Sequence, residues 1–450
     1  MTVTLPTTEE IERETLSLGR RLWQHQRRHR RVGRRSEDRA MAAMTAEPGL
    51  RAAVFRLVDV APACDGGGEL AEHLGAYLDE IREPSGLVAR SRRMLHGRLG
   101  SVAGGRAAGT AVRAIADRFI VGESVGSAVP VLAGLWADGT ASTVDLLGEA
   151  TVTPAEGDAY AERCLDALRT LHAAVEQWPA RPLLEHDAAG ALPRVNLSVK
   201  VTALTPLVRP QAPERARDDA GRRLLELLRA ARLLGAHLHI DMESFDSHEL
   251  ILELALELLS REEFADGPSA GIVLQAYLRD SEETLARVLD WAAGVRRSVP
   301  LTVRLVKGAY WDHEMIEATQ RGWEAPVWTD KRESDRCFER LTRALIDAFP
   351  LVRPAIASHN LRSVAHAVAY ARARGLGQAD VELQVLRGLG DELQRALAAE
   401  GLRCRTYCPV GDLVAGMAYL VRRLLENTSN ASFLTSSAAG VELDELLRCP

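Results

Sequence analysis

Residues 237–278 read HLHIDMESFDSHELILELALELLSREEFADGPSAGIVLQAYL, and this stretch decides the fold. Its ends, residues 237–244 and 271–278, are short apolar runs with the length and composition of buried strands. Between them HELILELALELLSREE, residues 248–263, places leucines on one face of a helix and charges elsewhere. A strand, an amphipathic helix and a second strand in this order are typical of repeated βα units with parallel strands.

The same alternation extends from about residue 140 to residue 411. It predicts eight strands, at residues 141–150, 194–204, 237–244, 271–278, 301–310, 353–360, 381–388 and 403–411. Eight strands with intervening helices match the size of a (βα)8 barrel. An open doubly wound sheet would share the alternation and stays as the alternative.

The chain before these repeats has a different character. Residues 7 to about 90 carry helical patterns and predict a helical arm followed by a helical region. HGRLGSVAGGRAAG, residues 96–109, is rich in Gly and Ala and marks a loop or a domain boundary. We therefore divide the chain into a helical part, residues 1–110, and a barrel, residues 111–440. The basic stretch from Arg20 to Ser36 suits either a phosphate or lipid contact or a solvated helix face, and its role stays open.

Composition narrows the class of protein. The chain has 450 residues, 46% of them hydrophobic, and a formal net charge of -6, which does not favour nucleic acid as a partner. Its start, MTVTLPTTEE, lacks the features of a secretory signal, so we expect a cytoplasmic protein. The six cysteines are scattered, which indicates reduced thiols and no disulfide framework.

Polar residues end most of the predicted strands, and in a (βα)8 barrel the active site lies at those ends. They are Lys200, Asp241, Glu243, Gln275, Arg304, Lys307, Ser358, His359 and Tyr407. Together with two later arginines, the basic residues outnumber the acidic ones, which favours an anionic substrate or cofactor. The clustered His and carboxylate ligands of a catalytic metal are missing from this set, so we expect no metal site.

DLVAGMAYLVRRLLEN, residues 412–427, follows the last predicted strand and predicts a helix. Tyr419, Arg422, Arg423 and Glu426 fall at i, i+3, i+4 and i+7, which places them along one side of it. Two adjacent arginines can bind one carboxylate, although spacing alone favours a surface salt bridge from Arg422 to Glu426. Arg422 lies roughly 15 Å along this helix, so the arginines reach the barrel mouth only if the helix lies across the top.

Several of these segments resemble the proline dehydrogenase family, most closely the proline dehydrogenase portion of the bifunctional proline utilisation A enzymes. The motifs that carry the resemblance are VRLVKGAYWD (303–312), HIDMES (239–244), VLQAY (273–277), ASHN (357–360), YCPVG (407–411) and AYLVRRLLENTSNASF (418–433). The resemblance covers roughly residues 115–435. It implies a distorted (βα)8 TIM-type barrel that binds FAD, with the last helix over the barrel mouth.

The resemblance also implies the reaction. A flavoprotein of this kind oxidises L-proline to Δ1-pyrroline-5-carboxylate by hydride transfer to flavin N5, the first step of proline catabolism to glutamate. Electrons then pass to a quinone, so the resemblance implies transient peripheral contact with a membrane.

Single residues receive roles by the same resemblance. Asp241 and Arg304 are implied in catalysis, with Arg304 near flavin N5 and Asp241 paired with Lys200. The residues implied at the substrate are Lys200, Tyr310, Leu386, Tyr407, Tyr419, Arg422, Arg423 and Glu426. Those implied at FAD are Met242, Gln275, Arg304, Val306, Lys307, Gly308, Trp311, Ser358 and His359.

Two positions depart from the family pattern. Ser358 stands where many relatives have Thr and keeps the hydroxyl, whereas Arg387 replaces a frequent His and leaves the local FAD contacts less defined. The sequence ends soon after SFLTSSAAG, residues 432–440, so we do not expect this chain alone to oxidise the product to glutamate. Two rival readings are a flavin barrel enzyme for hydroxyproline or another cyclic amine, and a non-catalytic barrel scaffold.

Overall fold

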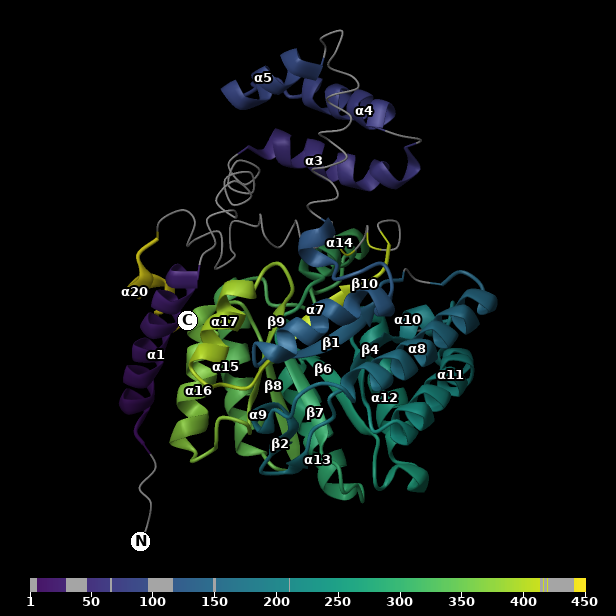
Figure 1. The fold of residues 1–450 in the computed structure, drawn as a ribbon, viewed down its shortest axis with the longest axis vertical. Coiled ribbons are helices and arrows are strands. Elements are labelled where there is room, and N and C mark those ends of the chain that lie inside the picture. The colour runs from purple at the N-terminus through teal and green to yellow at the C-terminus, as the bar shows by residue number, and fades with distance from the viewer. Residues whose placement is uncertain are drawn as a thin grey trace.

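The computed structural model describes residues 6–29, 47–64, 67–95, 116–148, 151–209, 211–412, 416, 419 and 441–450. Within them eight parallel strands close into a barrel in the order β1-β10-β9-β8-β7-β6-β5-β4 (Figure 1). The strands are β1 Ala141–Leu146, β4 Asn196–Lys200, β5 His237–Asp241, β6 Ser269–Gln275, β7 Leu301–Val306, β8 Val352–Ala357, β9 Glu382–Leu386 and β10 Cys404–Val410. The barrel and each of the eight predicted strands are confirmed, and the open sheet is wrong.

Helices surround the barrel, as the leucine-rich amphipathic stretches predict. They are α7 Val125–Ala137, α8 Pro154–Val175, α9 Pro182–Glu185, α10 Val201–Leu204, α11 Pro213–Leu233, α12 Phe245–Leu259, α13 Ser281–Gly294, α14 Trp311–Arg321, α15 Lys331–Asp347, α16 Leu361–Ala373 and α17 Asp391–Ala399, with the 3-10 turn η2 Glu262–Phe264. Their apolar faces and the outward side chains of the strands form one continuous core. Leu238 and Ile240 of β5, for example, belong to this core and are fully buried.

The strands alternate between an apolar outer face and a polar inner face. Along β5, His237, His239 and Asp241 alternate with the two core residues. Its neighbour β4 is paired so that Ser198 lies beside His239 and Lys200 beside Asp241. Because side chains alternate along a strand, the residues with the polar parity all point into the barrel. The interior is therefore polar, unlike the branched apolar layers that usually fill a (βα)8 barrel.

Near the N-terminal ends of the strands, the charged side chains inside the barrel form ion pairs with one another. Glu382 of β9 accepts a hydrogen bond from Arg405 of β10 at 2.8 Å. Arg353 of β8 binds Asp187, which comes from the small hairpin β2 His186–Asp187 and β3 Gly190–Ala191. Asp187 is also 3.4 Å from Arg403. The hairpin thus supplies the carboxylate that neutralises two buried guanidinium groups.

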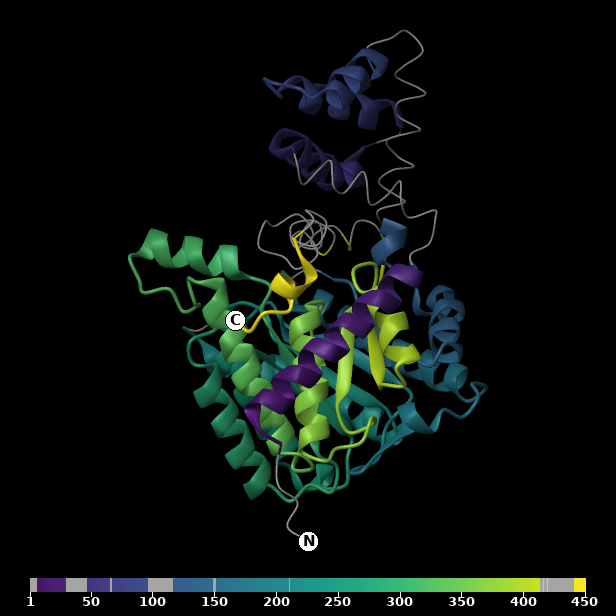
Figure 2. The same cartoon turned by 90° about the vertical axis from the view of Figure 1, so that its left-hand side faces the viewer.

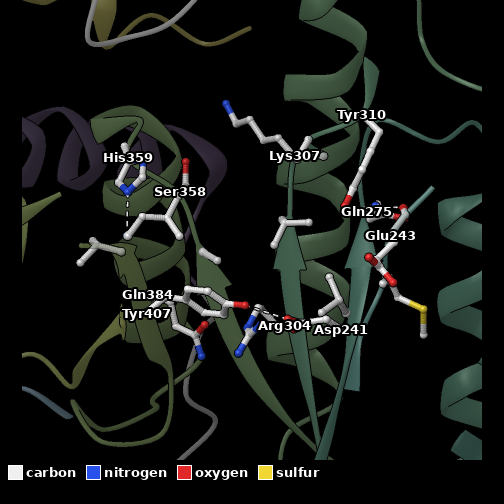
Figure 3. A pocket seen from close by; sticks show the side chains of 18 of the residues that line it. Asp241, Glu243, Gln275, Arg304, Lys307, Tyr310, Ser358, His359, Gln384 and Tyr407 are labelled. Atoms are coloured by element: carbon white, nitrogen blue, oxygen red, sulfur yellow. Dashed lines mark hydrogen bonds and ion pairs between the residues drawn. The ribbon is translucent and has the colours of Figure 1, made fainter. Parts of the chain in front are cut away.

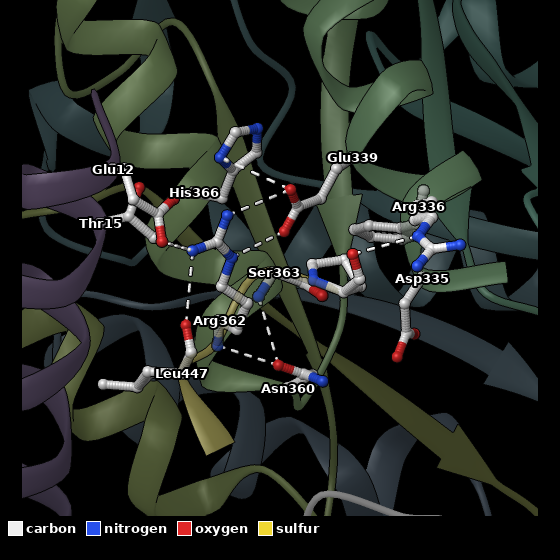
Figure 4. Close-up of polar contacts among 12 residues, drawn as sticks. Glu12, Thr15, Asp335, Arg336, Glu339, Asn360, Arg362, Ser363, His366 and Leu447 are labelled. Carbon is white, nitrogen blue, oxygen red and sulfur yellow. Dashed lines mark hydrogen bonds and ion pairs between the residues drawn. The ribbon is translucent and has the colours of Figure 1, made fainter. Parts of the chain in front are cut away.

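The first helix, α1 Thr8–His29, lies across the outside of the barrel against α16 and α17 (Figure 2). Figure 4 shows the centre of this contact, where Arg362 of α16 binds both Glu339 of α15 and Glu12 of α1. The Arg362 guanidinium also donates to the backbone oxygen of Leu447, at 3.4 Å. Leu447 follows the last short helix, α20 Leu443–Leu446, and is fully buried. The predicted helical arm is therefore a helix fixed to the barrel by ion pairs and apolar packing.

A second group of helices follows α1 along the chain. It comprises α3 Pro48–Val60, η1 Ala61–Ala63, α4 Gly67–Asp79 and α5 Gly86–Leu95. These helices pack on one another and lie away from the barrel in both overall views (Figures 1 and 2). The glycine-rich segment at residues 96–109 lies outside the described residues, so the division of the chain at residue 110 stays a prediction. Within the described ranges, no helix has the length and apolarity that crossing a membrane requires.

Candidate active site

A cavity of about 310 Å³ opens at the C-terminal ends of the barrel strands. Its wall contains most of the residues that the sequence singled out: Lys200, Asp241, Met242, Gln275, Arg304, Val306, Lys307, Gly308, Tyr310, Ser358, His359, Leu386, Tyr407 and Tyr419. Apart from Val385, the strand residues in this wall all occupy the alternate positions whose side chains point into the barrel. The alternation of each strand therefore brings the predicted residues together.

Arg304 and Asp241 form a buried ion pair on the floor of this cavity (Figure 3). Arg304 Nη1 donates to Asp241 Oδ1 at 2.8 Å, and Ser198 Oγ donates to the same oxygen at 2.7 Å. The hydroxyl of Tyr407 donates to the other carboxylate oxygen at 2.8 Å. Burial raises the pKa of Tyr407 well above its ordinary value, so this phenol stays a neutral donor. Asp241 thus fixes a guanidinium and a phenol at the same point of the floor.

Part of the Arg304 guanidinium has no such partner. Its Nε and Nη2 atoms are buried and donate to no acceptor within the described residues. The guanidinium carbon lies 5.2 Å from the centre of the Tyr407 ring. An unpaired buried donor is costly, so these atoms are suited to an acceptor that a bound molecule would supply.

Lys200 is held at the adjacent strand ends by a residue that sequence reasoning missed. Its ammonium forms an ion pair with Asp145 of β1, whose carboxylate is 1% exposed. Burial acts to lower the pKa of Lys200, but Asp145 and then Asp241 outweigh it, so that its pKa lies above the ordinary lysine value. The partner of Lys200 is Asp145, and the prediction that Asp241 fills this place is wrong. Asp241 acts on Lys200 only through its field and pairs instead with Arg304.

The opposite wall carries a second lysine and a histidine. Lys307 follows β7 and binds Asp335 of α15. His359 follows β8, and its Nε2 accepts the backbone N–H of Leu386 at 2.9 Å. A neutral His359 therefore carries its proton on Nδ1. Gly308 has a φ of +132°, and a Cβ there would lie 2.4 Å from the ring of Tyr277, so only glycine allows this close turn beside the cavity.

Several other wall residues carried no strand-end signal that we recognised. They are Asp145, Val273, Ala309, Lys331, Ala357, Asn360, Gln384 and Val385, whereas Glu243, which the sequence did single out at a strand end, also lies in this wall. Gln384 precedes Leu386 by two residues and donates from Nε2 to Glu382 at 2.6 Å. Strand alternation could have found Gln384, because it shares the parity of the predicted residue Leu386 on β9. Asp145 is the one charged residue within β1, but no site residue was predicted on that strand. Lys331 begins α15 and could not have been found in this way.

Four predicted site residues are not part of the described wall. Trp311 begins α14, is 39% exposed, and donates from Nε1 to the backbone oxygen of Trp328 at 2.9 Å. Arg422, Arg423 and Glu426 lie outside the described residues. Their predicted roles, and the predominance of positive charge that depends on the two arginines, stay predictions.

The amino-acid sequence matches two protein-family models and several curated proteins. The family model described as Proline dehydrogenase matches residues 128–436, and the one described as Proline utilization A N-terminal domain matches residues 12–119. A bifunctional protein PutA of Salmonella typhimurium is 32% identical over 371 residues, which is 81% of this chain and 27% of that protein. A proline dehydrogenase of Deinococcus radiodurans is 29% identical over 71% of this chain and 88% of its own length.

A solved structure agrees with these matches. It is proline utilization A from Bdellovibrio bacteriovorus, inactivated by N-propargylglycine, and it superposes with a TM-score of 0.86 at 36% identity over 98% of this chain and 44% of that one. The chain spans 27% of the Salmonella typhimurium protein and 44% of the solved Bdellovibrio bacteriovorus chain, which is less than half of each of these relatives. This chain belongs to the proline dehydrogenase family.

Proposed function

We propose that this chain is an FAD-dependent proline dehydrogenase, which oxidises L-proline to Δ1-pyrroline-5-carboxylate and passes the electrons to a quinone. The observation that carries the proposal is the Arg304 guanidinium, which Asp241 fixes on the cavity floor, and whose Nε and Nη2 find no acceptor among the described residues. Arg304 lies in the C-terminal half of β7, in a barrel whose family is named for this reaction.

The residues of the cavity fit a flavin. A hydride needs a cofactor as acceptor because no side chain can take it, and FAD would supply that acceptor at flavin N5. Arg304 would lie beside this atom and favour the negative charge that reduction brings. Gln275 is held by a hydrogen bond from its Nε2 to the backbone oxygen of Glu243, at 3.0 Å. Its amide oxygen is then suited to accept from a flavin N–H.

Proline would lie between the aromatic side chains and the cations. Tyr310, Leu386, Tyr407 and Tyr419 supply an apolar wall for the ring. Lys200 would bind the carboxylate together with Arg422 and Arg423, as the resemblance implies. Asp145 keeps Lys200 charged and in place, which is what an electrostatic contact to the carboxylate requires.

The decisive experiment is an anaerobic absorbance spectrum of the purified protein before and after addition of L-proline, with hydroxyproline in parallel. Bleaching of the flavin band by proline, and much less by hydroxyproline, is the expected result. Faster bleaching by hydroxyproline than by proline would identify hydroxyproline as the preferred substrate. A protein that takes up no flavin even after reconstitution would favour the non-catalytic scaffold instead.

Two substitutions test the carboxylate contacts directly. Arg422→Met and Arg423→Met should each raise the KM for proline while FAD stays bound, because each removes a charge-assisted contact worth about 1.5–3 kcal/mol. Arg287→Met is the matched control, since Arg287 lies on the exposed face of α13 and pairs with Glu249. Normal kinetics in both variants would contradict the carboxylate assignment.

A third substitution tests the role of Arg304 on the cavity floor. Arg304→Met should make the flavin harder to reduce, which a spectroelectrochemical titration measures as a lower midpoint potential. An unchanged potential would remove Arg304 from the neighbourhood of flavin N5.

A further inference from the structure

One acidic residue near the site holds two lysines at once. Asp335 lies in the first turns of α15, and its two carboxylate oxygens bind different cations. Oδ1 forms the ion pair with Lys307, and Oδ2 lies 2.8 Å from Lys331 Nζ. The Asp335 side chain is 17% exposed and that of Lys307 is 24% exposed, so this pair is largely buried and does not lie on the open surface.

The charge states of Asp335 and Lys307 follow from their surroundings. Burial acts to raise the pKa of Asp335, but Lys307 and Lys331 outweigh it and hold that pKa below the ordinary value. Burial lowers the pKa of Lys307, and Asp335 opposes this effect. Asp335 is therefore ionised, and it helps to keep Lys307 charged. Two cations and one anion leave the cluster with one net positive charge.

Both lysines face the cavity, where they meet further hydrogen-bond donors. Ser358 and Asn360 line the same cavity, and Asn360 also lines a second pocket together with Lys331. Ser358 Oγ accepts the backbone N–H of Asn360 at 3.1 Å, which leaves the hydroxyl proton to be donated elsewhere. An ammonium that spends one N–H on Asp335 keeps two others. This end of the cavity therefore presents several donors and a positive charge, the chemistry that binds phosphate.

We propose that Asp335 is a positioning residue for the cofactor phosphates, and that it holds Lys307 and Lys331 side by side as a clamp for the pyrophosphate of FAD. The inference rests on the proposed function, because it takes FAD as the ligand. It adds Lys331, which the resemblance did not assign, and it gives Asp335 a role that acts through the lysines. Without the shared carboxylate the two like charges repel each other and separate.

Substitution of Asp335 by asparagine separates positioning from charge. At a pH where Lys307 stays protonated, Asp335→Asn makes the cluster more positive, so charge alone predicts tighter binding of an anion, whereas positioning predicts weaker binding. Titration of FAD into apoprotein, followed by quenching of flavin fluorescence, should give a Kd about tenfold higher, equivalent to about 1.4 kcal/mol. Glu333→Gln is the matched control, because Glu333 lies on the same helix and pairs with exposed Arg336. It should change the Kd less than about twofold.

Two further titrations test whether Asp335 affects FAD binding through Lys331 and through the phosphates of FAD. In a Lys331→Met background the Asp335→Asn substitution should raise the Kd much less than in the wild-type protein, because residues that act together are not additive. Riboflavin, which lacks the phosphates, should bind the wild-type protein and Asp335→Asn alike. Thermal unfolding of each apoprotein checks that the variant folds. If Asp335→Asn does not fold, the FAD affinity of Lys331→Met is the test: a loss supports the lysine clamp, and an unchanged Kd overturns it.

The possible outcomes are distinct. Wild-type protein that binds no FAD would overturn the proposed function and this inference with it. Wild-type protein that binds FAD, together with unchanged or tighter binding by Asp335→Asn, would overturn only the positioning role. An equal loss of riboflavin and FAD binding would also overturn it, since the effect would then not involve the phosphates.

Discussion

Replacement of Asp241 by alanine should destabilise the barrel strongly. Asp241 is 7% exposed and accepts hydrogen bonds from Ser198, Arg304 and Tyr407, at 2.7, 2.8 and 2.8 Å. Arg304 is 4% exposed, and its Nε and Nη2 already donate to no acceptor within the described residues. The substitution would leave this buried guanidinium without a carboxylate. Loss of one partner of a buried ion pair costs about 3–5 kcal/mol.

Urea denaturation at neutral pH, followed by far-ultraviolet circular dichroism, measures this loss as a fall in the free energy of unfolding. The control is Glu249→Ala, which removes an exposed pair with Arg287 and should cost less than about 1 kcal/mol. Addition of Arg304→Met to Asp241→Ala should recover part of the stability, because it removes the unpaired charge. A loss no larger than that of Glu249→Ala, or no recovery in the double variant, would refute the reasoning.

Two other substitutions probe the interior and the wall. Burial acts to raise the pKa of Glu382, but Arg405 and Arg403 outweigh it and lower that pKa to about 2. The stability that Glu382 contributes, roughly 3 kcal/mol, is present above its unfolded pKa and is lost as the pH falls through the folded value. Glu382→Gln should therefore flatten the decline of the urea midpoint on acidification, and an unchanged slope would contradict this pairing. Gly308→Ala should lower the melting temperature and weaken FAD binding, whereas Gly294→Ala, which has open space around it, should do neither.

The eight strands could be predicted because each carries a short apolar face between helical patterns, but their ends could not. Residues 194–204 form one apolar run in the sequence, whereas the strand is Asn196–Lys200 and Val201–Leu204 is the helix α10. The run continues past the strand because α10 packs on α8. The predicted strand 301–310 likewise ends at Val306, and Lys307 and Gly308 turn into the site. An apolar run reports burial, and burial does not distinguish a strand from the helix that follows it.

The site was predicted less evenly than the fold. Residues at strand ends, such as Asp241 and Gln275, were found because the active site of a (βα)8 barrel lies at the C-terminal ends of its strands. Lys331 and Asp335 come from the start of a helix, where charged residues are ordinary, so the sequence offers no reason to select them. Only the folded chain brings Asp335 beside Lys307, 28 residues earlier.

Asp145 and Asp187 show why the charge pairs inside the barrel were harder to predict than the cations. Asp145 has a local signal, because it lies on a predicted strand, where alternation limits it to one of two faces, and its pairing with Ser198 turns it to the interior with Lys200. Asp187 has none, because it lies on a hairpin 166 residues away from its partner Arg353. A cation at an inward position nevertheless requires a nearby anion, since an unpaired buried charge is costly. A sequence that places Arg304, Arg353, Arg405 and Lys200 at inward positions therefore predicts buried carboxylates near each of them, even before the residues that supply them can be named.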